Sequence, residues 1–155
     1  MVIRDWSSDV CSSDLKKKSM QKTLIDSGPL IALFDGSDKH HLKVVEFLKT
    51  FKGELITSWS VITEVSHMLD FNLRVQIDFL KWVELGALML YEISQNDITH
   101  IRAMMEKYSD IPMDLADASL MYIADRQSIK NIISIDSDFD IYRTIKKLHL
   151  NNLLR

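Results

Sequence analysis

Acidic side chains follow apolar, β-branched segments of this sequence or lie near the starts of helical segments. Asp26 follows TLI and Asp136 follows IISI, while Glu64, Asp114 and Asp117 lie within helical patterns. The carboxyl ends of strands in an open α/β sheet meet at one edge, which is where such sheets bind ligands. Carboxylates gathered there repel one another, and a bound divalent cation relieves the repulsion. Oxygen ligands favour Mg²⁺ or Mn²⁺, which promote attack of water on a phosphodiester.

Some of these acids also suit a structural role. Asp26 is a suitable N-cap for the segment that follows it, and the capping and ligand interpretations both stay open. Asp114 is favoured as an N-cap, because Asp117 then falls in the first turn, where acids suit the helix dipole. For Asp117 itself the two interpretations are equally supported.

The remaining acids divide in the same way. Asp136 and Asp138 in SIDSDFD both suit a turn after a strand, and this is the favoured role for Asp138. Glu64 resists such an account, because a capping box would need Val61 as N-cap, and valine is a poor one. Glu64 lies instead at the edge of the apolar face of its helix, where an acid is usually solvated but can also face a cleft.

Strand-like and helix-like segments alternate along the chain. Strands are predicted at 22–26, 54–57, 87–93 and 131–136, with KLHL (147–150) as a candidate fifth. Helices are predicted at 27–34, 38–50, from about 60, at 73–85, after the N-cap Ser94, and at 113–127. In the helix over 73–85, Leu73, Ile77 and Leu80 are in phase. The alternation predicts an α/β fold with a mostly parallel sheet of four to five strands and helices on both faces.

Length and composition fit one globular domain of 155 residues and 18.0 kDa. No apolar run approaches the about 20 residues of a membrane helix, and the single cysteine is typical of a cytoplasmic protein. A net charge of −3 disfavours a broad basic face for nucleic acid. It does not exclude contact with phosphate through a metal ion, because the acids that hold the metal count as negative.

Four segments resemble, in order and approximate spacing, those of a PIN domain: TLIDSGPLIALFD, TSWSVITEVSHML, MDLADASLMYIA and IISIDSDFDIYR. The resemblance runs from Met20 to the C-terminus and is closest to small bacterial PIN proteins, many of them VapC-type toxins. It implies a three-layer α/β/α fold and Mg²⁺- or Mn²⁺-dependent cleavage of RNA. The four acids of the family match Asp26, Glu64, Asp117 and Asp136, which are thereby expected to bind metal and to be catalytic.

The same resemblance suggests supporting residues around the four acids. Ser27 and Ser134 fall where the family often has a hydroxyl, which would assist metal or phosphate. Asp114 and Asp138 are the expected acids next to the ligands. Arg143 and Lys146 are candidate contacts to the RNA backbone. For both residues, a position on a solvated helix face is an alternative that is at least as well supported.

The partners implied are an RNA substrate, a small antitoxin protein and a second copy in a homodimer, with no membrane association. Two alternatives stay open. One is a housekeeping RNA-processing PIN nuclease without an antitoxin. The other is a non-catalytic α/β module that binds RNA or protein and whose acids are caps and turns.

The first 19 residues differ from the rest of the chain. DWSSDVCSSDL, residues 5–15, holds the only cysteine and resembles the translation of a short-read sequencing adapter joined to the reading frame. A disordered native tail is the alternative, given its Ser and Asp content. From Met20, MQKTLID leads directly into the first predicted strand. We expect residues 1–19 to be a non-native or disordered extension and residues 20–155 to form the PIN domain.

Deletion of residues 1–19 is therefore expected to leave Mn²⁺ affinity and RNA cleavage unchanged, because no predicted strand, helix or ligand lies in them. Calorimetric titration of Mn²⁺ and a cleavage assay on the full and shortened chains measure this. A shortened chain without activity would show that the stretch belongs to the domain.

Overall fold

The computed structural model describes residues 20–111 and 113–155, so the extension predicted for residues 1–19 lies outside the described residues. The sheet has five strands, all parallel to their neighbours, in the order β3-β2-β1-β4-β5. The strands are β1 (Lys22–Ile25), β2 (Glu54–Thr57), β3 (Met89–Leu90), β4 (Asn131–Ile133) and β5 (Asn151–Asn152). The predicted parallel α/β sheet is confirmed.

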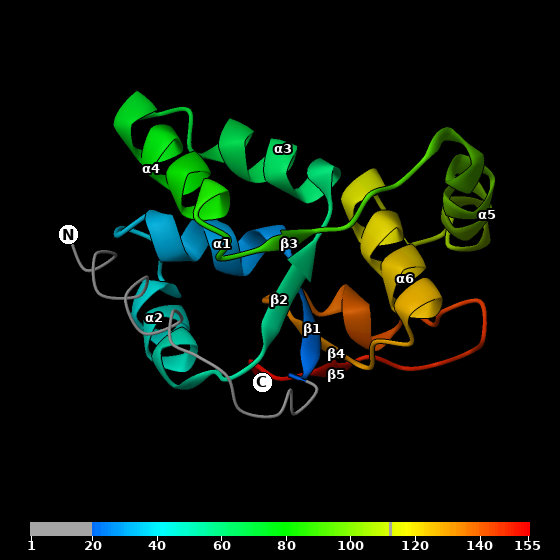
Figure 1. Cartoon of the computed structure of the whole chain (residues 1–155). Helices are drawn as coiled ribbons and strands as arrows, with labels where there is room; N and C mark the ends of the chain where they lie inside the picture. Colours follow the sequence, from blue (N-terminus) through cyan, green and yellow to red (C-terminus); the bar gives the residue numbers. More distant parts are fainter. Residues whose placement is uncertain (1–19, 112) are drawn as a thin grey trace, which may run out of the picture.

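Helices cover both faces of this sheet. They are α1 (Ser27–Phe34), α2 (His41–Thr50), α3 (Trp59–Met68), α4 (Leu73–Glu84), α5 (Ile98–Lys107) and α6 (Leu115–Gln127). Two short 3₁₀ helices, η2 (Gln95–Asp97) and η3 (Asp138–Asp140), accompany them. Figure 1 shows α1 and α2 on one side of the sheet and α6 on the other, with α5 packed on the outside of α6. The result is the three-layer α/β/α arrangement.

The order of the strands creates a crevice beside the central strand. The chain moves outward from β1 through β2 to β3 and then returns past β1 to β4 and β5. Because crossovers between parallel strands are right-handed, this reversal places the connecting helices on opposite faces. Ile25 of β1 pairs with Ile133 of β4, and the next N–H, of Asp26, donates to the Ile133 carbonyl at 3.1 Å. The carboxyl ends of β1 and β4 therefore bound the switch point of the sheet.

The core explains why these segments take these conformations. The β-branched and leucine side chains of β1 and β4 are fully buried, which matches strands covered on both faces. Helix α6 is buried along nearly its whole length, from Ala116 to Asp125. It is therefore the central helix of its layer, and α5 shields its outer side.

Two strand predictions need correction. The strand predicted at 87–93 is confined to β3, because its partner β2 ends at Thr57, whose carbonyl accepts the N–H of Tyr91 as the last bond. The candidate fifth strand at 147–150 is wrong in position, and β5 follows it directly. Lys147 has a positive φ of 61°, and Thr144 and Leu148 are hydrogen-bonded to each other across this turn. A turn of this kind excludes an extended strand.

The predicted apolar stripe of α4 is also wrong as a buried face. The structure buries Phe79 and Trp82, whereas Leu73 is 70% exposed and Ile77 and Leu80 are exposed as well. Phe34 of α1 explains the choice, because its ring packs edge-on against both buried aromatic rings, with centroids 5.3 and 5.5 Å away. Aromatic rings bury more area than the aliphatic side chains and so determine which face of the helix turns inward.

No helix within residues 20–111 and 113–155 has the length and apolar character that crossing a membrane requires.

Helix α6 ends at Ser128, an exposed residue with φ 54° and ψ 36°. This left-handed conformation strains any residue with a Cβ atom and suits glycine. Ser128→Gly is therefore expected to raise the free energy of unfolding by about 0.5–1 kcal/mol. Urea denaturation measures the change, with Ser128→Ala as the control that keeps the Cβ atom. A Gly variant no more stable than the Ala variant would contradict the expectation.

Candidate active site

Two acids are placed at the switch point by the strands that precede them. Asp26 directly follows β1, and Asp136 lies three residues beyond the end of β4. Ser134 connects them, because its Oγ donates to Asp26 Oδ2 at 2.9 Å and accepts the Asp136 N–H at 3.0 Å. The two acids predicted from strand ends therefore share one edge and one hydroxyl.

Asp26 combines both of its predicted roles. It is the N-cap of α1, where its Oδ1 accepts the Ser27 N–H at 2.7 Å. Its side chain is also 5% exposed and faces the other acids. Burial, together with the charges of Glu64 and Asp136, raises its pKa to about 6, although hydrogen bonds from Ser134 and Ser27 act in the opposite direction. A carboxyl that only capped a helix in water would have no such raised pKa.

The other two acids come from helices that pack against each other. Glu64 lies on α3, half-buried, and its pKa is raised by burial and by the charge of Asp114, with the Ser27 hydroxyl opposing. Asp117 lies on α6 and is 9% exposed. Burial and the charges of Asp114, Asp26 and Asp136 raise the pKa of Asp117 to about 8. The charge of Glu64 thus reaches Asp26, and the charges of Asp26 and Asp136 reach Asp117, so the structure places the four acids around one region.

The neighbouring acids have structural roles. Asp114 is the N-cap of α6, as favoured from the sequence, and its Oδ1 accepts the Asp117 N–H at 2.8 Å. In the loop after β4 the roles differ from the prediction, because Asp136 rather than Asp138 is the acceptor of the turn. Its Oδ1 accepts the Asp138 N–H at 2.9 Å. Asp138 then begins η3 with a half-buried side chain.

Tyr142 belongs to this site and was not predicted from the sequence. Its fully buried hydroxyl donates to Asp117 Oδ2 at 3.4 Å. Burial raises the pKa of this phenol, and the charges of Asp117 and Asp138 add to the effect, so the hydroxyl keeps its proton. Tyr142 reaches Asp117 only through the turn around η3, and no local pattern in the sequence signals that.

Three serine hydroxyls join α3 to α6, and they too were missed. The Oγ atoms of Ser58, Ser60 and Ser119 lie 2.6–2.9 Å from one another. Ser58 is the N-cap of α3, and its position before an apolar helical pattern is a sequence signal for that role. The contact fixes the helix that carries Glu64 against the helix that carries Asp117.

The predicted RNA contacts are engaged within the protein. The Arg143 guanidinium donates to the carbonyls of Asp140, Ile141 and Tyr142 at 2.7–3.0 Å. The ammonium group of Lys146 donates to the Asp125 carbonyl at 3.0 Å. Both cations thus secure the chain that follows η3, and their contact with RNA stays a prediction.

The donor set fits a hard divalent cation, although the protein alone does not hold the acids in a closed cluster. Within residues 20–111 and 113–155, no three acidic, histidine or cysteine side chains are close enough to form a ready-made metal site. In the same part of the chain, no Lys or Arg forms an ion pair with the four acids. Burial is the main cause of the raised pKa values of Asp26, Glu64 and Asp117, and the charges of neighbouring acids add to it. Four carboxylates offer the oxygen ligands that Mg²⁺ and Mn²⁺ prefer.

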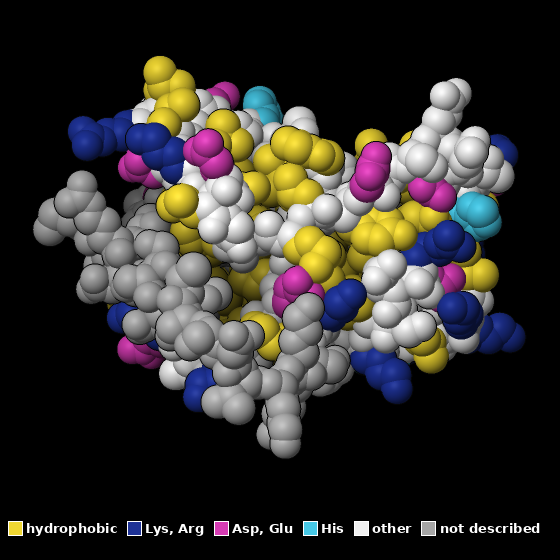
Figure 2. All heavy atoms as spheres, in the orientation of Figure 1, with side chains coloured by type: hydrophobic (Ala, Val, Ile, Leu, Met, Phe, Trp, Pro, Cys, Tyr) yellow, Lys and Arg dark blue, Asp and Glu magenta, His cyan; other side chains and the backbone are white. Residues whose placement is uncertain are grey.

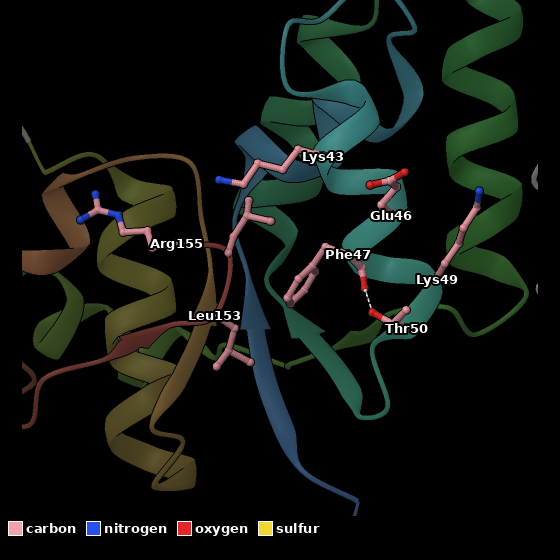
Figure 3. Close-up of a pocket in the computed structure, with 8 residues that line it drawn as sticks. Lys43, Glu46, Phe47, Lys49, Thr50, Leu153 and Arg155 are labelled. Atoms are coloured by element: carbon pink, nitrogen blue, oxygen red, sulfur yellow. Dashed lines mark hydrogen bonds between the residues drawn. The ribbon is translucent and has the colours of Figure 1, made fainter.

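A hollow of about 740 Å³ lies elsewhere, between α2 and the C-terminal segment. Figure 3 shows Phe47 and Leu153 in it, with Lys43, Lys49 and Arg155 around it. None of the four predicted acids lines this hollow. The candidate active site is therefore defined by the carboxylates at the switch point.

Fold and site together define an α/β protein with a carboxylate cluster at the switch point of a parallel sheet. The family model for the PIN domain matches residues 23–144, and the chain belongs to this family. The family predicted from the four sequence segments is thus confirmed.

Individual relatives agree with the expected VapC-type likeness. Ribonuclease VapC26 of Mycobacterium tuberculosis is 27% identical over 115 residues, which cover 73% of this chain and 85% of that protein. The crystal structure of M. tuberculosis VapC20, described as a toxin that cleaves the sarcin-ricin loop, superimposes with a TM-score of 0.70 at 15% identity. It covers 77% of this chain and 93% of VapC20.

A complex from Rickettsia felis, VapBC2 bound to a DNA fragment of its promoter, gives a TM-score of 0.59 at 12% identity. It covers 85% of this chain and 98% of the matched chain. At such identities the two structures establish the likeness of fold alone.

The raised pKa values predict how stability depends on pH in metal-free solution. An unfolded chain ionises Asp26 and Asp117 near pH 4, whereas the folded protein does so near pH 6 and pH 8. The stabilisation that comes from protonated Asp26 and Asp117 in the folded protein is complete below about pH 4 and is lost as the pH rises to about 8. Asp117→Asn is expected to be more stable than the wild type at pH 8 and to show a flatter profile.

Thermal unfolding in chelator between pH 5 and pH 8.5 measures this difference. Asp78→Asn, which changes an exposed acid on α4, is the matched control and should keep the wild-type slope. Parallel profiles for the wild type and Asp117→Asn would contradict the expected strain at the site.

Proposed function

We propose that the protein is a Mg²⁺- or Mn²⁺-dependent endoribonuclease and the toxin of a type II toxin–antitoxin pair. The main observation is the convergence of Asp26, Glu64, Asp117 and Asp136 at one switch point in a PIN domain, with no Lys or Arg of the described chain paired to them. Such a site attracts a cation and, through it, a phosphodiester. The proposed domain comprises residues 20–155.

In the proposed mechanism each acid has a position-dependent task. Asp26, Glu64, Asp117 and Asp136 would hold one or two metal ions, which lower the pKa of bound water and neutralise charge on the phosphate. Asp26 and Asp117 are buried and fix the base of the site. Asp136 is exposed, so it is suited to orient the attacking water at the solvent side.

The surrounding polar groups would keep these carboxylates aimed. Ser134 donates to Asp26, and Ser27 lies beside both Asp26 and Glu64. Tyr142 donates to Asp117. Neutral hydroxyls hold a carboxylate without competing with the metal for its charge, as outer partners of metal ligands do.

The relatives support the substrate and the partners proposed. VapC26 is a ribonuclease and VapC20 a toxin that cleaves the sarcin-ricin loop, so RNA is the proposed substrate. The VapBC2 complex supports a small antitoxin partner. We propose in addition a homodimer acting in the cytoplasm, with Arg143 and Lys146 contacting the RNA backbone.

RNA cleavage is expected with Mn²⁺ or Mg²⁺ and is expected to stop in chelator. Loss of a residue that only hydrogen-bonds a metal ligand reduces activity by about 10- to 100-fold. Asp26→Asn and Asp117→Asn would each remove a proposed ligand itself, so each should reduce the cleavage rate by more than that. Gel analysis of total RNA measures cleavage, and calorimetry with Mn²⁺ measures ion binding in the same samples.

Asp78→Asn serves again as the control, because it removes the same charge from an exposed position on α4 and should cleave like the wild type. Equal activity in all samples, with or without chelator, would contradict the proposal. Growth arrest on expression distinguishes a toxin from a processing enzyme. A protein that neither binds Mn²⁺ nor cleaves RNA would instead be the non-catalytic module.

A further inference from the structure

A second hollow, of about 140 Å³, lies between the starts of α3 and α6. Trp59, Ser60, Tyr91, Leu115 and Ser119 are among its lining residues, and we call it the Trp59 pocket. In Figure 2 the outline of the molecule is indented between α3 and α5, and hydrophobic side chains gather on this side. Its volume is close to the about 150 Å³ of a cavity that takes up benzene, so it suits one aromatic ring.

The side chains at this pocket are unusually exposed for their type. Trp59 is 63% exposed and Leu115 is 52% exposed, although both are large and apolar. Exposed apolar side chains around a hollow mark a binding surface. An indole is also the type of side chain on which nucleobases stack, whatever their sequence.

The pocket is also lined by hydroxyls whose oxygens can accept further hydrogen bonds. Ser119 donates its one proton to the Ala116 carbonyl at 2.7 Å. Only the protons of Ser58 and Ser60 remain for the three contacts among the three Oγ atoms. Because there are fewer protons than contacts, these oxygens keep lone pairs, and Ser60, which is only half-buried, can accept a hydrogen bond from an N–H group that enters the pocket. The edges of nucleobases carry such N–H groups.

The pocket and the acids are built on the same two helices. Ser60 and Glu64 are one turn apart on α3, and Leu115 directly follows the capping residue Asp114. Ser119 lies about half a turn around α6 from Asp117, on the opposite side of the helix. A helix with its side chains is about 10 Å across. Stacked nucleotides are spaced at about 3.4 Å, so about three of them cover the distance from one side of α6 to the other.

We propose that the Trp59 pocket binds one nucleobase of single-stranded RNA, a few nucleotides from the bond that is cleaved. This inference rests on the proposed function and adds a site for the substrate to it. The base stacks on the Trp59 indole, and its polar edge meets the hydroxyls of Ser60 and Ser119. The hydroxyls of Ser60 and Ser119 among the lining residues, and the position of Ser60 one turn from Glu64 on α3, favour a nucleobase over a second copy of the protein.

The test compares RNA binding and cleavage by pocket variants. Binding of a fluorescently labelled single-stranded RNA octamer of mixed sequence is measured by anisotropy in an Asp26→Asn background, which prevents cleavage. Trp59→Ala is expected to weaken binding about 5- to 150-fold, the range for loss of one base stack. In the active protein it should raise KM with kcat nearly unchanged, and Trp59→Phe should retain most of the affinity.

Phe71→Ala is the matched control, because Phe71 is an aromatic residue of similar exposure, 61%, outside the pocket. It should bind and cleave as the wild type does. Sedimentation of each variant reports the oligomeric state.

Three outcomes would overturn the inference in distinguishable ways. Wild-type affinity in Trp59→Ala, with cleavage intact, removes the pocket and leaves the proposed function standing. A wild-type protein that neither binds nor cleaves RNA removes both. A Trp59→Ala variant that dissociates into monomers, and loses RNA affinity only to that extent, assigns the pocket to a second copy.

Discussion

The pairing of β1 with β4 imposes the central constraint on this protein, because it brings carboxylates together that repel one another. Asp26 and Asp136 come to the edge from these strands, and α3 and α6 add Glu64 and Asp117. The raised pKa values of Asp26 and Asp117 express the cost of this arrangement. Folding therefore proceeds against local electrostatics at the carboxyl edge of the sheet.

The rest of the structure supports this unfavourable cluster without neutralising it. Ser134 and Tyr142 donate to the buried Asp26 and Asp117. The hydroxyls of Ser58, Ser60 and Ser119 join α3 and α6, the helices that carry Glu64 and Asp117. The side chains of Arg143 and Lys146, which follow η3 in the chain, are instead directed to backbone carbonyls. Within the described residues no Lys or Arg is paired with the four acids, so their oxygens stay open to the proposed ligand.

The sequence predicts where Asp26 and Asp136 lie because a parallel sheet converts position along the chain into position in space. Any aspartate that ends a strand reaches the same edge, so Asp26 and Asp136 could be placed together from pattern alone. Tyr142 and the serine trio could not, because their contacts join residues up to 61 positions apart in the chain through the packing of helices. The predicted apolar stripe of α4 is not its buried face, because that helix carries more apolar residues than it buries. Packing against the ring of Phe34 determines that Phe79 and Trp82 are the buried ones.

The almost complete burial of α6 has a consequence for how the protein changes over time. A helix with solvent on one side can accept substitutions there while it keeps its functional residue, but α6 has few positions of that kind between Ala116 and Asp125. Asp117 therefore shares its helix with the core, and most mutations near it alter packing before they alter chemistry. Substitutions in the loop after β4, where Asp136 is exposed, disturb the core less than substitutions in α6, which carries Asp117.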